Sequence, residues 1–372
     1  MSWVPRFPEV KHQLQIGNGQ FGTLISMGAV GSVISLIIAG PLVHRFGSRK
    51  VMSFSVILIF LTLAYVVHVT SVWQFLFCNM AIGAGVSGFH IAVNSQALHE
   101  QRAGGESLMP RLHGVWSVGA ITTAILSGLL IGHVSLATHI DSVAIFVLIS
   151  ILILIKKLGK NSLKGKRREE TDYSVRSIFA RSNIDWLMGL GATCAAALEY
   201  STSDWAAIFS KEELHMGAGV STLPYILFIS TMIIGRLTSH RLTDHIGIDR
   251  LIRLCTIIGG VTFIVAINVG VQVSKSLPTL GFSIVLIGYF VGGLGVSFLI
   301  PTFMHAASRR SNAPGSVALG QLGAINTTLI LIVKPIIAWT AQLTSIRVAL
   351  IIPGVMLIGV AFFASAVKKA LD

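Results

Sequence analysis

Long apolar runs alternate with short polar stretches along the whole chain. Residues 51–67 and 144–155 contain no charged side chain, and comparable runs recur from one end to the other. A helix of about 20 apolar residues is long enough to cross the hydrocarbon core of a bilayer. The pattern therefore predicts eleven membrane-spanning helices, over residues 19–43, 50–69, 72–98, 111–133, 139–158, 184–208, 217–242, 251–273, 278–306, 317–342 and 347–367.

The basic residues are distributed unevenly between alternate loops. Nine Lys and Arg residues lie between positions 156 and 181, and smaller groups occupy the other loops of the same side. The loops of the opposite side contain only Arg6, Lys11, Lys211, Lys275 and Arg347. Because Lys and Arg accumulate in cytoplasmic loops, we expect the first side to be cytoplasmic. The net charge of +13 then reflects membrane topology, and no basic groove with stacking aromatics indicates a nucleic-acid partner.

One long polar stretch divides the predicted helices into two groups. It predicts an N-terminal bundle over 1–158, a basic cytoplasmic linker over 159–182 and a C-terminal bundle over 183–372. Residues 11–24 resemble residues 211–224 at an offset of 200, and GAGVS at 83–87 resembles GLGVS at 293–297 at an offset of 210. Two parallel repeats of a helical bundle are typical of secondary transporters, whose substrate site lies between the repeats.

Composition and the reactive residues argue against a soluble enzyme. Hydrophobic residues make up 53% of the chain and charged residues 12%, against about 25% charged in an ordinary soluble domain. The three cysteines, Cys78, Cys194 and Cys255, lie in apolar segments without a CxxC spacing, and we expect free thiols. No nucleotide-binding motif, paired catalytic groups or metal-ligand spacing is recognisable, so neither a catalytic residue nor a cofactor nor a metal is expected.

A loop motif follows the first predicted helix, in the sequence GPLVHRFGSRK. Its glycines allow a sharp turn and a close approach of the helices, while its charged residues can latch a cytoplasmic gate. It resembles the loop signature of the major facilitator superfamily, with His44 at the position of the usual Asp. The residues that we assign to this first copy are Gly40, His44, Arg45, Gly47, Arg49 and Lys50.

A second copy lies in the predicted C-terminal bundle, between residues 235 and 247. It contributes Gly235, Arg236, Asp244 and Gly247 to the same signature. HIAVN at 90–94 and LEYSTSDW at 198–205 further resemble the fucose-permease-like branch, including uncharacterised bacterial inner-membrane members. The opening SWVPRFPEVK resembles the end of that branch's first helix, so we expect most of helix 1 to be missing and Arg6 to be a surface residue.

The resemblance implies an all-α major facilitator fold: two pseudo-symmetric six-helix bundles with the first helix largely missing. It further implies a monomeric multi-pass protein of the cell inner membrane. Its expected function is the movement of a small hydrophilic, possibly sugar-like solute by alternating access, driven by protons. A non-transporting sensor or scaffold, or a truncated transporter remnant, is the alternative. An intact polar stripe along residues 79–94 argues for transport.

Candidate binding residues are polar groups inside predicted spans. An ionisable side chain at the centre of a bilayer costs about 2.5–3.5 kcal/mol, so such groups indicate function. The branch's protonatable helix-4 Glu aligns with His90, one turn before Asn94, and its helix-5 Asn aligns with Trp116. The substrate- or proton-binding candidates are His90, Asn94, Glu199, Lys334, Trp116 and Asn79.

Two of these candidates are expected to form a pair. Lys334 is the single Lys or Arg that we expect deep within a span, and Glu199, beyond the middle of its own span, is the expected partner. Asp204 is expected near the outer surface. Helix packing for the polar stripe and snorkelling of Lys334 to the outer interface are the alternatives.

Overall fold

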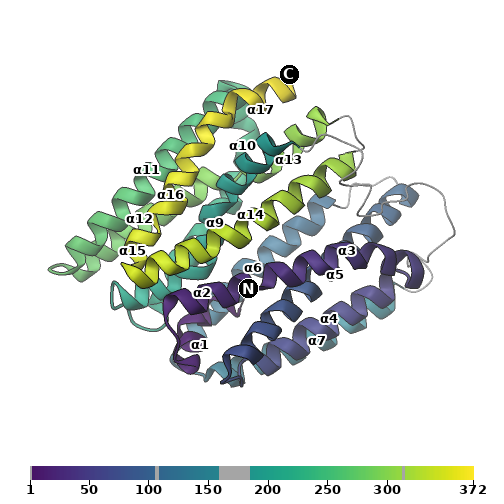
Figure 1. The fold of residues 1–372 in the computed structure, drawn as a ribbon, viewed down its shortest axis with the longest axis horizontal. Helices are drawn as coiled ribbons and strands as arrows, with labels where there is room; N and C mark the ends of the chain where they lie inside the picture. The colour runs from purple at the N-terminus through teal and green to yellow at the C-terminus, as the bar shows by residue number, and fades with distance from the viewer. Residues whose placement is uncertain (1, 105–108, 159–184, 312–314) are drawn as a thin grey trace. The chain divides into compact units, whose positions relative to one another are not determined.

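The protein is described by a computed structural model over residues 2–104, 109–158, 185–311 and 315–372 (Figure 1). Within these ranges every regular element is a helix. Nine of the described helical stretches are long and apolar enough to span a membrane. The predicted linker over 159–182 lies outside the described residues. The chain divides into two compact units, residues 1–16 with 23–172 and residues 17–22 with 173–372.

The first unit is built around α5, the longest of its helices. The helices α3 and α4 pack along α5, and α4 also packs against α7. Apolar side chains such as Val56 and Ala92 are fully buried in the resulting core. The elements of this unit are η1 Val4–Arg6, α1 Phe7–Leu14, the second half of α2 Asn18–Ser26, α3 Gly28–Phe46, α4 Ser48–Val66, α5 Val72–Gly104, α6 Met109–Leu130 and α7 Leu136–Lys157. Residues 18–22 of α2 belong to the second unit.

The second unit is centred on α9, which packs against α10, α12, α13, α14 and α16. A pair of neighbouring helices, α11 and α12, forms its most extensive contact. The elements of this unit are α9 Trp186–Glu212, η3 Val220–Thr222, α10 Leu223–Ile246, α11 Ile248–Ser274, α12 Pro278–Val296, α13 Leu299–Arg310, α14 Gly315–Leu343, α15 Ile346–Ala349, α16 Ile351–Gly359, η4 Val360–Phe363 and α17 Ala364–Leu371.

The sequence repeat corresponds to a repeated backbone geometry. Gly47 separates α3 from α4 with φ 86° and ψ 154°, and Gly247 separates α10 from α11 with φ 80° and ψ 150°. In each turn the glycine N–H donates to a carbonyl of the preceding helix, Val43 at 2.8 Å and Thr243 at 2.9 Å. A residue with a Cβ is strained at such a positive φ. The offset of 200 residues therefore marks the same helix–turn–helix in both units.

Most predicted spans coincide with helices, but several of them are divided. The span predicted over 19–43 is divided into α2 and α3, the span predicted over 278–306 into α12 and α13, and the span predicted over 347–367 into α15, α16, η4 and α17. The second interruption has a physical cause in Pro301, which lacks the N–H that a continuous helix would need at this position. Apolar periodicity does not reveal such a break, because side chains on both sides of it remain apolar.

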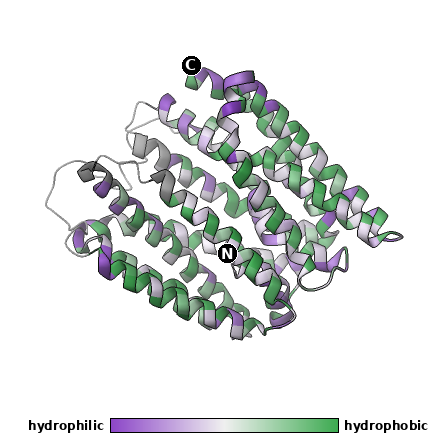
Figure 2. Ribbon diagram, turned by 180° about the vertical axis from the view of Figure 1, so that it is seen from behind, coloured by the Kyte–Doolittle hydropathy of each residue, from purple (hydrophilic) through white to green (hydrophobic). Residues whose placement is uncertain are grey.

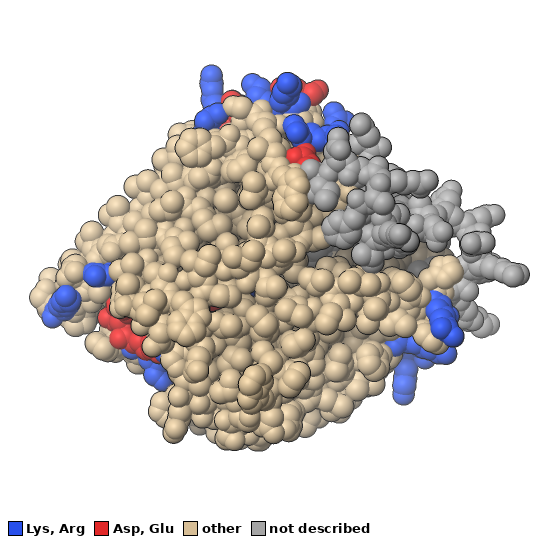
Figure 3. Space-filling model, in the orientation of Figure 1, with Lys and Arg blue, Asp and Glu red and all other residues tan. Residues whose placement is uncertain are grey.

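Hydrophobic residues, green in Figure 2, occur along most of the length of the described helices. Large hydrophobic side chains are exposed, among them Trp73 at 71%, Phe146 at 72% and Phe362 at 84%. The Lys, Arg, Asp and Glu side chains visible in Figure 3 gather in a few groups, and broad parts of that face carry none. This distribution is expected for helices whose outer surface contacts lipid.

The opening segment is tied firmly to the first unit, and Arg6 is buried with 1% of its side chain exposed. Its guanidinium donates to Glu9 at 2.9 and 3.0 Å, to His139 Nδ1 at 3.1 Å and to the Val134 carbonyl at 3.0 Å. Ser2 Oγ lies 2.8 Å from the other ring nitrogen of His139. The expectation of a surface Arg6 was wrong, because His139 of α7 and the Val134 carbonyl before α7 supply acceptors far from Arg6 in the sequence.

Candidate functional site

An ion pair joins two helices inside the second unit. Lys334 Nζ of α14 lies 2.8 Å from Asp204 Oδ2 of α9, and the two side chains are 16% and 8% exposed. At ~1.5 Å per residue, each lies about 12–14 Å from the final residue of its helix. The pair therefore lies in the interior of both helices and not at their ends.

The pair corrects two expectations about this region. Glu199 was expected to be the partner of Lys334, and Asp204 was expected near the outer surface, whereas Asp204 is buried and holds the lysine. Five residues turn an α-helix by about 140°, so Glu199 and Asp204 face different neighbours. The rotation of α9 against α14 decides which carboxylate meets the lysine.

Tyr200 lies next to the ion pair, one helical turn before Asp204 on α9. It lies four residues before Asp204, so both side chains occupy one face of α9. Lys334 Nζ lies 5.4 Å from the centroid of its ring, a cation–π contact, and Asn326 of α14 forms a side-chain hydrogen bond with Tyr200. The Asn326 Oδ1 atom is buried and has no partner among the described residues. Tyr200 is 37% exposed, so the cluster is accessible at its ring.

A second cation, Arg236, lies in the middle of α10 close to Glu199. Its Nε donates to the Ser297 carbonyl at 2.9 Å, and its charge acts on the Glu199 carboxyl. Arg236 lies three residues before the end of the candidate span Val220–Ser239, whereas Lys334 lies nine residues before the end of α14. The carboxylates of Glu199 and Asp204 are balanced by the charges of Arg236 and Lys334, which lowers the free-energy cost of burying them. We call Glu199, Tyr200, Asp204, Arg236, Asn326 and Lys334 the charged cluster.

The binding residues predicted from the sequence did not include four members of the charged cluster: Tyr200, Asn326, Arg236 and Asp204. A signal was present for the first two, because Tyr200 is one turn from Asp204 and Asn326 is two turns from Lys334. Arg236 was assigned to the cytoplasmic loop motif because Gly235 precedes it. Its true neighbourhood became visible only from the packing of α10 against α12.

The candidates of the first unit lie on two helices. His90 and Asn94 occupy α5 one turn apart, His90 exposed and Asn94 half-buried, while Trp116 lies on α6 with 44% exposure. Asn79 is buried, and its amide donates to the Phe75 carbonyl of its own helix at 2.9 Å. This local bond accounts for the burial of Asn79 without a ligand. His90, Asn94 and Trp116 stay predicted site residues.

The loop motif is divided between helix ends and helix interiors. In the first copy, His44 and Arg45 end α3 with exposed side chains, and the Arg45 guanidinium lies 5.2 Å from the Phe46 ring centroid. In the second copy, Asp244 is exposed near the end of α10, whereas Arg236 belongs to the charged cluster. A gating role for Gly40, His44, Arg49, Lys50, Asp244 and the two turn glycines stays a prediction.

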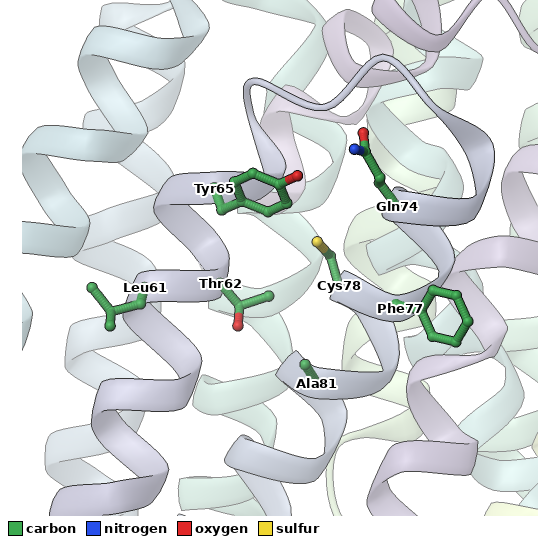
Figure 4. A pocket seen from close by; sticks show the side chains of 7 residues that line it. All are labelled: Leu61, Thr62, Tyr65, Gln74, Phe77, Cys78 and Ala81. Carbon is green, nitrogen blue, oxygen red and sulfur yellow. The ribbon is translucent and has the colours of Figure 1, made fainter.

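A groove of about 450 Å³ lies between α4 and α5 (Figure 4). Leu61, Thr62 and Tyr65 line it from α4, and Gln74, Phe77, Cys78 and Ala81 line it from α5. It contains no ionisable group except the Tyr65 phenol and the Cys78 thiol, and most of its lining is apolar. Such a groove on a membrane helix pair offers less for recognising a polar solute than the charged cluster does.

Among the described residues, no three His, Cys, Asp or Glu side chains gather as a metal site would require. The three cysteines are free thiols, Cys78 buried and Cys194 and Cys255 half-buried. The free thiols expected from the sequence are confirmed.

Comparison with known proteins places these features in a family. The model of the Major Facilitator Superfamily matches residues 4–328. An uncharacterised MFS-type transporter of Yersinia pestis is 27% identical over 375 residues, which cover 99% of this chain and 92% of that protein. The membrane protein MosC of Rhizobium meliloti is 24% identical over 351 residues, covering 94% and 82% of the two chains.

Solved structures show the same fold at low sequence identity. A mutant of the nucleoside transporter NupG superposes with a TM-score of 0.76 at 12% identity, covering 98% of this chain and 95% of that one. A D-xylose-proton symporter superposes with a TM-score of 0.72 at 12% identity, covering 98% and 93%. With an all-helical fold, apolar exterior and a family match over most of its length, this chain belongs to the Major Facilitator Superfamily of transporters.

Proposed function

We propose that this transporter moves a small hydrophilic solute across the cell inner membrane by alternating access, as a monomer, and that the charged cluster binds the solute. The observation that carries the proposal is the Asp204–Lys334 pair at 2.8 Å within a bundle of apolar helices. Side chains of this kind are costly in a bilayer and mark substrate or ion pathways. Apolar residues of similar size would pack the same space without that cost.

The chemistry of the cluster favours a neutral, hydroxylated solute. Its two carboxylates and two cations cancel, so an added charge on the solute would lack a counter-charge. Tyr200 presents a ring on which a sugar face can stack, and Asn326 Oδ1 is an acceptor for a hydroxyl. Two similar structures are a nucleoside transporter and a D-xylose-proton symporter, both of which act on hydroxylated molecules. A sugar-like solute agrees with the fucose-permease-like sequence features.

We further propose that transport is coupled to protons. Glu199 is a carboxyl group within a membrane helix, next to the charge of Arg236, and a protonation change there alters the balance of the cluster. His90 of α5 is the second proposed carrier, because an imidazole titrates near neutral pH. In this scheme Asp204 holds Lys334, while Glu199 and His90 exchange the proton.

The proposal is tested by uptake into proteoliposomes containing the purified full chain. Radiolabelled sugars, polyols and nucleosides are offered with and without an inward proton gradient. Asp204→Asn and Lys334→Gln should each abolish uptake of the solute that the wild-type protein accumulates. Asp249→Asn is the matched control, because it removes one carboxylate from the more exposed Asp249–Lys368 pair of the same unit, at 3.8 Å.

Equal uptake by wild type, Asp204→Asn and Lys334→Gln would place the solute site elsewhere. Loss of uptake in the Asp249→Asn control as well would show that any lost ion pair impairs the protein. The result for Asp204 and Lys334 would then no longer indicate that the charged cluster binds the solute. Accumulation that ignores the proton gradient would refute the coupling while leaving the solute site standing.

A further inference from the structure

The membrane helix formed by α12 and α13 is broken between Val296 and Leu299, and both helices are labelled separately in Figure 1. The Ser297 N–H donates to the Leu294 carbonyl at 3.3 Å, a tighter turn than an α-helix makes. The next regular bond, from the Thr302 N–H to the Phe298 carbonyl at 3.1 Å, belongs to α13. The joint therefore lies in the interior of a span.

The joint has a covalent cause in Pro301. In a continuous helix the Ser297 carbonyl would accept from the N–H of residue 301, but proline has no N–H. Unsatisfied backbone carbonyls are costly where lipid excludes water. Arg236 Nε supplies the missing donor at 2.9 Å.

A glycine allows the arginine to reach the joint. The position of a Cβ at Gly235 would clash with the side chain of Ser297, so a larger residue would separate α10 from α12. The close approach of α10 and α12 at Gly235 therefore places the neighbouring Arg236 beside the Ser297 carbonyl.

The first unit provides an internal comparison. The offset of 210 residues places Ile91 opposite Pro301 and Ser87 opposite Ser297, and α5 runs without interruption from Val72 to Gly104. The offset of 200 places Leu36 opposite Arg236. The proline, the arginine and the break occur together in one unit and are absent together from the equivalent positions of α3 and α5 in the other.

From these contacts we infer that Arg236 is a positioning residue, which fixes the angle between α12 and α13. Without its guanidinium the Ser297 carbonyl loses its donor, and the α12–α13 joint loosens. This inference goes beyond the proposed solute and proton sites, because it concerns the joint between α12 and α13 and does not depend on which solute is transported.

The inference is tested by measuring the distance between spin labels on the two helices in the full chain, reconstituted without solute. Cys78, Cys194 and Cys255 are first replaced by Ser, and labels are attached through Ile287→Cys and Met304→Cys, both exposed positions. These positions are about 25 Å apart along the helix at ~1.5 Å per residue, a distance accessible to pulsed electron paramagnetic resonance.

Arg236→Gln should broaden the distance distribution and add a population at a different separation. Adding Pro301→Ala to Arg236→Gln should narrow it again, because alanine restores the N–H that Ser297 needs. Pro335→Ala, which removes a proline from α14, is the matched control and should leave the Arg236→Gln distribution broad. Arg241→Gln removes an exposed charge from the same helix and should leave the wild-type distribution unchanged.

An unchanged distribution in Arg236→Gln, or a rescue by Pro335→Ala as effective as that by Pro301→Ala, would overturn the inference. Because no solute is used, a failure here is distinct from a failure of the proposed transport function.

Discussion

Lys334 Nζ and Asp204 Oδ2 lie 2.8 Å apart between α14 and α9, at a depth where neither charge could be left alone. The pair is the firmest contact within the charged cluster, and its removal can be measured without knowing the solute. Its predicted effect on stability is therefore the first to test.

Lys334→Gln should destabilise the second unit by about 3–5 kcal/mol, because it leaves the buried Asp204 carboxylate without its counter-charge. The double variant Asp204→Asn with Lys334→Gln should recover much of this loss, since no unpaired charge remains. Thermal unfolding of the detergent-solubilised protein measures both. Lys368→Gln, from the more exposed pair with Asp249, should cost less than about 1 kcal/mol. A double variant as unstable as Lys334→Gln alone would contradict this account.

Separate roles are predicted for His90 and Glu199: His90 supplies the coupled change in protonation, and Glu199, besides carrying a proton, holds the solute. His90→Gln should abolish gradient-driven accumulation and preserve exchange, because exchange needs the solute site and no net change in protonation. Glu199→Gln should weaken binding by about 1.5–3 kcal/mol, which is roughly 10- to 100-fold in Kd. Counterflow and accumulation assays in the same proteoliposomes distinguish the two variants. Reversed phenotypes would exchange the roles, and normal accumulation by both variants would remove them from the site.

Arg6 is predicted to hold the opening segment on the first unit. Arg6→Gln leaves the Glu9 carboxylate and the Val134 carbonyl without the donor they share, and should lower stability by about 3 kcal/mol. Limited proteolysis should then cleave within residues 2–16 more rapidly than in the wild-type protein. The exposed Lys50 offers a matched control, and Lys50→Gln should leave the cleavage rate unchanged. Equal cleavage of Arg6→Gln and wild type would show that the network is dispensable.

The distribution of Lys and Arg predicts that the linker over 159–182 is cytoplasmic. A cysteine at Ser162, in a cysteine-free protein, should not react with an impermeant maleimide applied to intact cells. A cysteine at Ser276, in the exposed turn between α11 and α12, should react because that turn is predicted to face outward. Efficient labelling at Ser162 with none at Ser276 would invert the topology.

The sequence by itself determined the helical class, the approximate spans and the repeat. Apolar periodicity and loop charge are local properties, because each helix satisfies its own backbone hydrogen bonds whatever its neighbours are. The equivalence of Gly47 and Gly247 was likewise readable, since a turn between two helices needs the same positive φ wherever it recurs. The family resemblance rested on these local features and is confirmed by the match over residues 4–328.

Only the tertiary structure decided which polar groups meet. Asp204 and Glu199 lie five residues apart on one helix. The rotation of α9 against α14 determines that Lys334 forms its ion pair with Asp204. The same holds for Arg236. Its sequence context predicts a place in the loop motif, whereas the packing of α10 on α12 brings its side chain to the Ser297 carbonyl. Arg6 becomes buried because α7 and Glu9 surround it with acceptors. The angle and rotation of one helix against another depend on the summed packing of many side chains, and no short stretch of sequence encodes that sum.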